Sequence, residues 1–347
     1  MPNMQTYDLN VPGFARPLGN GLGQGFMTDA ALSGGMAFLT SELEKLDPRL
    51  NEPLSSFFYP RDIPVVIGGG WADTTASLFT DYGVSGGSGE GAGAGGAAND
   101  VGIIQGNTTK SVYPTHPYQR VLRVKWIDAQ RSDVIGRSLE QLYNTGLRLD
   151  YDKHLDLNCY LGYNKFNTVG LVNNPEVITG PAANNAAGTS TVWANKSADE
   201  ILADVNNAIN AVWMACEYAV MPNHILVNPA NYAMLVARKV DPLGSKSILT
   251  YLMENNLAVH QGFNIEIFPS RFCGDDPALP NPGTGGTNRM VVYVNNSDRI
   301  LMDILQPLTR SMVSQNTTFL SYDTAYAANI GSVRVLYLES IRYVDGI

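Results

Sequence analysis

The chain has 347 residues, of which 44% are hydrophobic and 16% charged, and its formal net charge at pH 7 is −9. This composition excludes a disordered tail, and the length is sufficient for two or three domains with a large core. The acidic balance and the lack of any Lys/Arg cluster exclude a protein whose main task is to grip nucleic-acid phosphates, so contact with nucleic acid must be loose.

The lack of a recognisable targeting signal and the spacing of the cysteines indicate an intracellular origin. No apolar run approaches the ~20 residues that span a bilayer, and the stretch from Met1 to Pro12 lacks the pattern of a signal peptide. Cys159, Cys216 and Cys273 lie far apart without a CxxC spacing, which favours reduced thiols in a buried setting. We therefore expect no membrane association and a cytoplasmic origin.

The first 57 residues predict an arm. Residues 1 to about 27 are rich in Gly, Pro and Asn and read as an extended segment. From Thr28 an apolar stripe at helical spacing predicts an amphipathic helix that ends before Pro48; its members are Leu32, Met36, Leu39, Leu43 and Leu46. A short amphipathic helix on an arm needs a partner surface.

A long hairpin is expected next. An extended segment at 57–59 and a short strand at 65–67 precede strand-like stretches at 71–81 and 101–113, with a tip at 83–98 that is nearly all Gly, Ala and Ser. An isolated hairpin is marginally stable in water, so this one should rest on a neighbour.

The middle of the chain predicts a strand at 121–126, with Leu122, Val124 and Trp126 on its buried side, followed by one helix at 131–161. A continuous helix of that length measures roughly 45 Å. Its predicted apolar face contains Ile135, Leu139, Leu142, Gly146 and Leu149, and the opposite face contains Arg137, Ser138, Glu140, Gln141, Asn144 and Arg148. On this pattern alone it is a core helix of an α+β domain.

Helices and strands mix in the second half, as in an α/β layer. The capping box from Ser197 to Glu200 starts a helix that should end before Pro222, and further helices are expected from Asn228-Pro229 and at 247–256. Strands are predicted at 225–227, around Ile265 and Ile267, and at 290–294, 300–304, 317–322 and 333–337, with a Pro/Gly-rich loop at 272–288.

Nothing in the sequence nominates an active site, cofactor or metal. Residues 91–96 fit G-x-G-x-x-G, yet no strand precedes them and no helix follows. His116, His154, His224 and His260 are scattered without a zinc spacing, and Asp275-Asp276 reads as a solvated acidic turn rather than a calcium site. No nucleophile is accompanied by a base, so we expect no enzyme.

The order of these parts resembles the major capsid protein of a tailed bacteriophage, in the HK-ninety-seven-type fold that encapsulin shells also use. The likeness covers nearly the whole chain, including the segments at 170–175 and 225–232 and the terminal Arg342-Tyr343-Val344-Asp345-Gly346-Ile347. The resemblance implies an N-terminal arm (1–57), an E-loop hairpin (58–124), a P domain (125–195 with about 305–338) that holds the 131–161 spine helix, and an A domain (196–304 with about 339–347).

The same resemblance implies hexamers and pentamers that close into an icosahedral shell around double-stranded DNA, assembled in the host cytoplasm and retained in the virion. Its expected partners are a portal, a separate scaffolding protein and a cement protein, with loose contact to the packaged DNA. Lys110 is the only lysine between Lys45 and Lys125 and lies off the glycine tip, so no covalent crosslink is expected. We expect intersubunit contacts at Leu39, Leu43, Trp71, Gly89, Gly93, Tyr113, Arg137, Glu140 and Arg148.

Two other classes remain open at this stage. One is an encapsulin-type compartment that holds cargo enzymes, and the other is a soluble enzyme with an α/β domain. Neighbouring genes distinguish the first from a phage shell, and a discrete monomer in light scattering would favour the second.

Overall fold

A computed structural model of the chain describes residues 57–85, 103–135, 139–241 and 244–347, all of which belong to one unit that spans 56–347. Several predicted features lie outside these residues: the amphipathic helix with Leu39 and Leu43, the glycine tip with Gly89 and Gly93, and Arg137.

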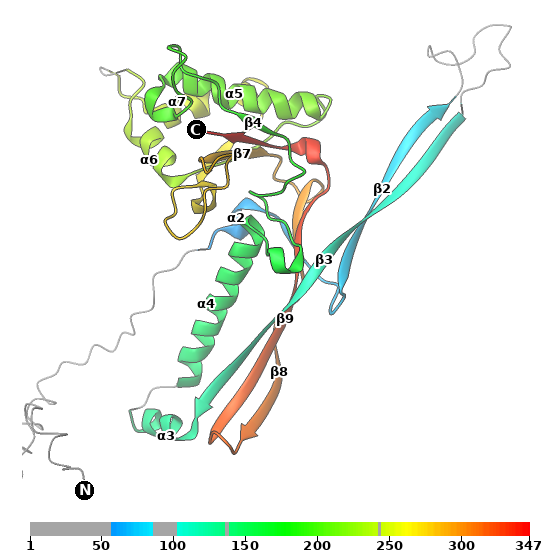
Figure 1. Cartoon of the computed structure of the whole chain (residues 1–347), viewed down its shortest axis with the longest axis vertical. Helices are drawn as coiled ribbons and strands as arrows, with labels where there is room; N and C mark the ends of the chain where they lie inside the picture. Colours follow the sequence, from blue (N-terminus) through cyan, green and yellow to red (C-terminus); the bar gives the residue numbers. More distant parts are fainter. Residues whose placement is uncertain (1–56, 86–102, 136–138, 242–243) are drawn as a thin grey trace, which may run out of the picture. The chain divides into compact units, whose positions relative to one another are not determined.

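The first sheet has the strand order β1-β8-β9-β3-β2 (Figure 1). Its strands are β1 (Val65–Ile67), β2 (Thr74–Ser85), β3 (Ile103–Lys125), β8 (Ile300–Asn316) and β9 (Ser321–Val335). β2 and β3 form the predicted antiparallel hairpin, with Thr74 opposite Pro114 and Ser85 opposite Ile103. The strand predicted at 121–126 is not a separate element, because it is the far end of β3.

β3 changes its pairing partner along its length. Its first half, up to Pro114, pairs with β2, and its second half, from Thr115 opposite Gly331 to Lys125 opposite Ser321, pairs with β9. One uninterrupted strand of 23 residues therefore belongs both to the hairpin and to the sheet. We call the step from Pro114 to Thr115 the exchange point.

The second sheet has the order β4-β10-β7-β5-β6. It contains β4 (Thr179–Pro181), β5 (His224–Val227), β6 (Glu266–Pro269), β7 (Arg289–Tyr293) and β10 (Ile341–Asp345). β5 and β7 are buried along their whole length, which explains the apolar runs that follow His224 in β5 and Arg289 in β7. The strands predicted at 225–227, near Ile267 and at 290–294 are confirmed.

Helices α5 (Ala198–Ala215), α6 (Pro229–Ala237), α7 (Ile248–Asn255) and α8 (Leu257–His260) accompany the second sheet. The predicted capping box is present: the Ser197 side chain accepts from the Glu200 backbone N–H, and the Glu200 carboxylate accepts from the Ser197 N–H. α5 ends at Ala215, earlier than predicted, and Glu217 and Tyr218 take positive φ values after it.

Two predicted elements are wrong. Residues 59–62 form a short helix, α2 (Tyr59–Asp62), with Pro60 in its first turn, rather than an extended segment. Residues 317–320 form a turn between β8 and β9, because Asn316 Oδ1 accepts from two following backbone N–H groups and Leu320 has φ 46°. The long helix corresponds to α3 (Trp126–Ile135) and α4 (Leu139–Tyr160), separated by residues 136–138, which are not described.

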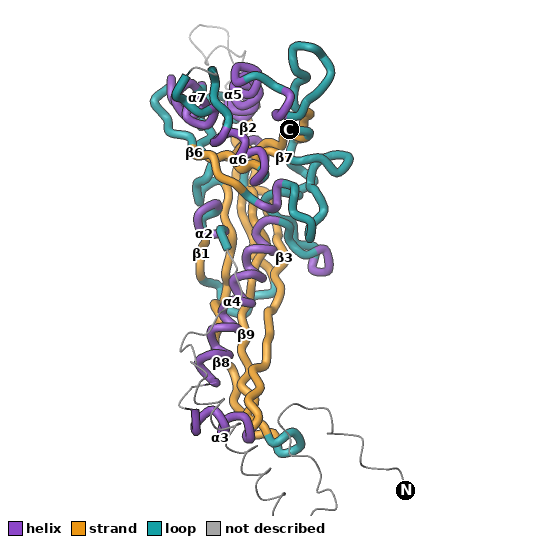
Figure 2. The backbone as a smooth tube through the Cα atoms, turned by 90° about the vertical axis from the view of Figure 1, so that its left-hand side faces the viewer, coloured by secondary structure: helices purple, strands orange, loops and turns teal. Residues whose placement is uncertain are grey.

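The start of α3 changes one expectation. Trp126 starts α3 and is 50% exposed, although the alternating pattern placed it on the buried side of a strand. α4 has 22 residues and is therefore about 33 Å long, and the continuity of the expected helix across 136–138 lies outside the described residues. α4 lies along β3 and β9 (Figures 1 and 2).

A buried carboxylate connects α2 and α4 to the second sheet. Asp62, fully buried in α2, accepts hydrogen bonds from Arg61 and from the Tyr160 hydroxyl of α4, and His224 Nε2 lies 3.3 Å from its Oδ1. Burial alone would raise the pKa of Asp62, but these partners outweigh it and lower the pKa. The main core around it includes Leu155, Tyr293 and Ile330.

Candidate assembly interface

One face of the β2–β3 hairpin exposes large apolar side chains. Successive side chains of a strand point to opposite faces, and residues directly opposite each other share a face. Ala76 lies opposite Val112, Leu78 opposite Lys110 and Tyr82 opposite Gly106, so these residues and Ile104 lie on one side, which we call the outer face. Leu78, Tyr82, Ile104 and Val112 are 70%, 72%, 71% and 55% exposed. Such a strip is typical of a surface that another chain covers.

The opposite face of the hairpin packs within the chain. The Phe79 ring meets Tyr337 edge-on at 6.3 Å, and Arg334 Nη1 donates to Ser77 Oγ at 3.0 Å. A cavity of about 520 Å³ remains on this side, lined by β2, Ser297, Asp298, Arg334, Leu336 and Tyr337. Of the residues expected at subunit contacts, Tyr113 is half-buried and Trp71 is 56% exposed.

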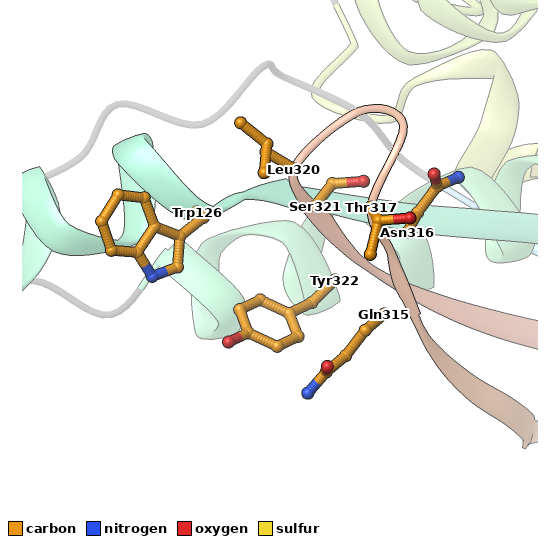
Figure 3. A pocket seen from close by; sticks show the side chains of 7 residues that line it. All are labelled: Trp126, Gln315, Asn316, Thr317, Leu320, Ser321 and Tyr322. Carbon is orange, nitrogen blue, oxygen red and sulfur yellow. The ribbon is translucent and has the colours of Figure 1, made fainter.

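A second apolar cluster lies where β3 leads into α3, beside the β8–β9 turn. We call Trp126, Ile127, Phe319, Leu320 and Tyr322 the turn cluster; each is between 42% and 63% exposed. The Trp126 backbone N–H donates to the Leu320 carbonyl at 2.8 Å, which fixes α3 to the turn. The indole of Trp126 and the phenol of Tyr322 flank a small pocket of about 130 Å³ (Figure 3).

Local contacts hold the turn cluster in shape. Arg123 forms a bidentate pair with Asp323 at 2.9 Å, and its guanidinium lies 4.6 Å from the Phe319 ring centre. The Arg123 contact lowers the pKa of Asp323 to about 2. The sequence pattern missed this cluster because it placed Trp126 inside and read the turn as a strand.

The face of α4 that meets the sheet differs from the predicted one. Leu142 and Leu149 are only half-buried and Gly146 is exposed, whereas Tyr151, Leu155, Asn158 and Cys159 are buried. In the first half of the helix, Asn144 points to the sheet and accepts a hydrogen bond from the Tyr326 hydroxyl at 2.8 Å.

A cavity of about 510 Å³ lies beside this contact, between α4 and strands β8 and β9. Its lining residues are Gln141, Asn144, Thr145, Leu147, Arg148, Leu308 and Tyr326. Arg148 is exposed at its rim, and the side chain of Glu140 is outside the described part.

The described residues contain no cluster of three or more His, Cys, Asp or Glu side chains that fits a metal ion. Asp275 accepts hydrogen bonds from Asn228 and Asn288, and Asp276 Oδ1 accepts from the Ala278 N–H at 2.9 Å, which are the contacts of an acidic turn. Across the same residues, no helix has the length and apolar character to cross a membrane.

Known proteins resemble this arrangement along most of the chain. The family model for major capsid proteins matches residues 89–347. The chain belongs to the major capsid protein family. No curated protein matches its sequence.

Solved phage capsids share the fold of this capsid chain. The capsid of Myoviridae phage XM1 is 19% identical with a TM-score of 0.69, covering 88% of this chain and 98% of that one. The structures of Microbacterium phage Oxtober96 and Gordonia phage Cozz are 12% and 13% identical, each with a TM-score of 0.56; they cover 89% and 90% of this chain, and 98% and 93% of their own. The fold is therefore the α+β HK-ninety-seven-type capsid fold.

Proposed function

We propose that this capsid chain assembles as hexamers and pentamers into an icosahedral shell that encloses phage double-stranded DNA. The observation that carries the proposal is the outer face of the hairpin, which exposes Leu78, Tyr82, Ile104 and Val112, whereas the described part of the chain packs against the opposite face. In a shell, a neighbouring copy covers this strip and excludes water from it.

We assign a separate role to each of the domains expected from the sequence. The E-loop (58–124) reaches a neighbour, the P domain (125–195 with about 305–338) carries α4 and the turn cluster, and the A domain (196–304 with about 339–347) holds most of the second sheet. The turn cluster is a second contact site between copies, because its five large apolar side chains remain exposed on a backbone that the Trp126–Leu320 hydrogen bond holds in place.

The charge of the chain suits a container better than a nucleic-acid binder. With a net charge of −9, the shell wall repels packaged DNA on average, so contacts with DNA are few and local. The chain acts as a structural protein without catalytic chemistry, in the virion, after assembly in the host cytoplasm. A portal, a separate scaffolding protein and a cement protein are its proposed partners.

Negative-stain electron microscopy of the expressed full chain tests the proposal. We expect closed shells or capsomers, and fewer of them after deletion of residues 83–98 or truncation before Thr28, with both variants still folded. A discrete monomer at all concentrations, or normal shells from both variants, would overturn this account of assembly. Adjacent terminase and portal genes support a phage shell, whereas an adjacent cargo-enzyme gene would contradict DNA enclosure.

A further inference from the structure

Two histidines that are 38 residues apart in the sequence meet between β3 and α4. The Nε2 atoms of His116 and His154 lie 3.1 Å apart, and their ring centres are 5.3 Å apart. The difference, 5.3 − 3.1 = 2.2 Å, is about the diameter of one imidazole ring, so the two nitrogens point at each other. This is the geometry of an N–H···N hydrogen bond, whereas two ligands of one metal ion would converge on a third point.

The pair lies at the root of the hairpin. His116 is two residues beyond Pro114, the last β3 residue paired with β2, and is itself paired with Ile330 of β9. Its side chain is 1% exposed. The contact therefore connects α4 to β3 close to the exchange point.

Aromatic rings enclose the pair. The ring of Phe166, in the short 3-10 helix η2 (Asn164–Phe166), stacks on His116 at 4.8 Å and 8°. Tyr163 stacks on His154 at 4.6 Å, and its hydroxyl oxygen lies 2.8 Å from His154 Nδ1. Three elements, β3, α4 and η2, thus meet at this one cluster.

The hydrogen bonds define where protons sit at neutral pH. Among the described residues, His116 Nδ1 is buried without a hydrogen-bond partner. A buried acceptor without a partner costs less than a buried N–H without one. The favoured arrangement therefore has His116 Nε2–H donating to His154 Nε2, and His154 Nδ1–H donating to the Tyr163 oxygen. A further proton on the pair must then go to the buried Nδ1 of His116 or break one of these bonds.

Among the charged groups around the cluster, Arg120 disfavours that extra proton, and Asp150, which favours it, already has other partners. On α4, Asp150 Oδ2 already accepts from the Tyr118 hydroxyl at 2.6 Å and from Arg120 Nε at 2.9 Å, both on β3. On the η2 side, the Lys165 ammonium lies 5.9 Å from the Phe166 ring. Tyr151 of α4 is a neutral buried phenol in contact with Tyr118, and the facing residue of β9 is Ile330.

Burial therefore lowers the pKa of both imidazoles to about 4. For His116, the positive charge that His154 would carry adds to the effect of burial. For His154, Arg120 lowers the pKa further, and Asp150 acts in the opposite direction.

We propose that the contact between His116 and His154 is acid-sensitive, holding the root of the β2–β3 hairpin against α4 at neutral pH and releasing it when the pair takes up a proton. Two imidazolium rings whose Nε2 atoms lie 3.1 Å apart repel each other, and a single one in this aromatic enclosure lacks an acceptor for its new N–H. The release is a property of the folded subunit, so it goes beyond the proposed shell function and does not depend on it.

Hydrogen exchange measured by mass spectrometry on the isolated full chain tests this inference. Exchange is compared at about pH 7 and about pH 4, on either side of the sequence pI of about 4.9 where solubility is lowest, after correction for the intrinsic pH dependence of exchange. We expect protection of residues 112–120 to fall at least about tenfold at the acid pH while β10 keeps its protection. Equal loss in β10, or no loss at 112–120, would overturn the proposal.

Variants distinguish loss of protection caused by protonation of the histidine pair from loss caused by a general effect of acid on the chain. His116→Gln keeps a hydrogen-bonding side chain but removes the buried imidazole, so protection at 112–120 should no longer depend on pH. His260→Gln removes an exposed histidine in α8 and should behave as the unaltered chain. If His116→Gln does not fold, His154→Gln provides the same comparison. Unchanged acid loss in the folded variant would refute the role of the pair.

Discussion

Replacing two apolar residues on the outer face of the hairpin should weaken assembly without affecting the fold. Leu78 and Ile104 are 70% and 71% exposed, so they contribute little to the core. Full burial of such a side chain is worth about 1.5–3 kcal/mol, and the exposed fraction leaves about 1–2 kcal/mol for each to gain at an interface. The double variant Leu78→Ser/Ile104→Ser should therefore lose about 2–4 kcal/mol per contact, or about 30- to 1000-fold in the association constant.

Sedimentation velocity over a range of concentrations measures the loss, and thermal unfolding of the unassembled chain checks the fold, where a change within about 0.5 kcal/mol is expected. Gln105→Ser is the matched control, since Gln105 is exposed next to Ile104 but points to the other face. Assembly of the folded double variant at the concentration of the unaltered chain would refute the assignment of the outer face.

Three further predictions concern the stability of the folded chain. Ser197→Ala removes one partner of the capping box of α5 and should cost about 1 kcal/mol in urea denaturation; an unchanged midpoint would contradict the cap. Gly170→Ala places a Cβ inside van der Waals contact of the Tyr160 carbonyl oxygen and should cost about 1–3 kcal/mol by the same measurement; an unchanged midpoint would contradict this close approach. Stability should also fall with acid: the pKa of His116 is about 4 when folded and 6.5 ordinarily, so its contribution is complete above pH 6.5 and lost as the pH approaches 4, by up to about 3 kcal/mol. A flat denaturation midpoint between pH 7 and 4 would contradict it.

Local signals in the sequence predicted local structure well. Ser197 and Glu200 specify the start of α5 through hydrogen bonds within four residues, and the apolar run at 225–227 specifies a buried strand. The hairpin strands follow from their composition on either side of the glycine tip. The order of these parts was sufficient to predict the capsid fold.

The features that the sequence did not predict depend on pairing between residues far apart in the chain. The sequence predicts two separate strands, at 101–113 and 121–126, yet β3 continues through Pro114 and Pro117 because it pairs first with β2 and then with β9. Likewise, the contact face of α4 follows its partners on the sheet, such as Tyr326 against Asn144, rather than the spacing of leucines.

The candidate surfaces, too, were predictable from the sequence only where they depend on local signals and not on long-range pairing. The hairpin was expected to need a neighbour, but the alternation that places Leu78 and Ile104 on one side requires the register of β2 with β3. The turn cluster depends on the turn at 317–320, which brings Leu320 to Trp126 across almost two hundred residues. The meeting of His116 with His154 likewise depends on the packing of α4 on β3, which no spacing in the sequence encodes.

The continuity of β3 has a mechanical consequence. Because the same strand pairs with β2 up to Pro114 and with β9 from Thr115 to Lys125, tension applied at the hairpin tip runs along the strand axis. The hydrogen bonds between β3 and β9 lie across that axis and are loaded in shear, so they share the force, whereas peeling would break them one after another. A hairpin joined to its body in this way works as a tether, and we expect it to bear pulling between neighbours far better than bending away from them.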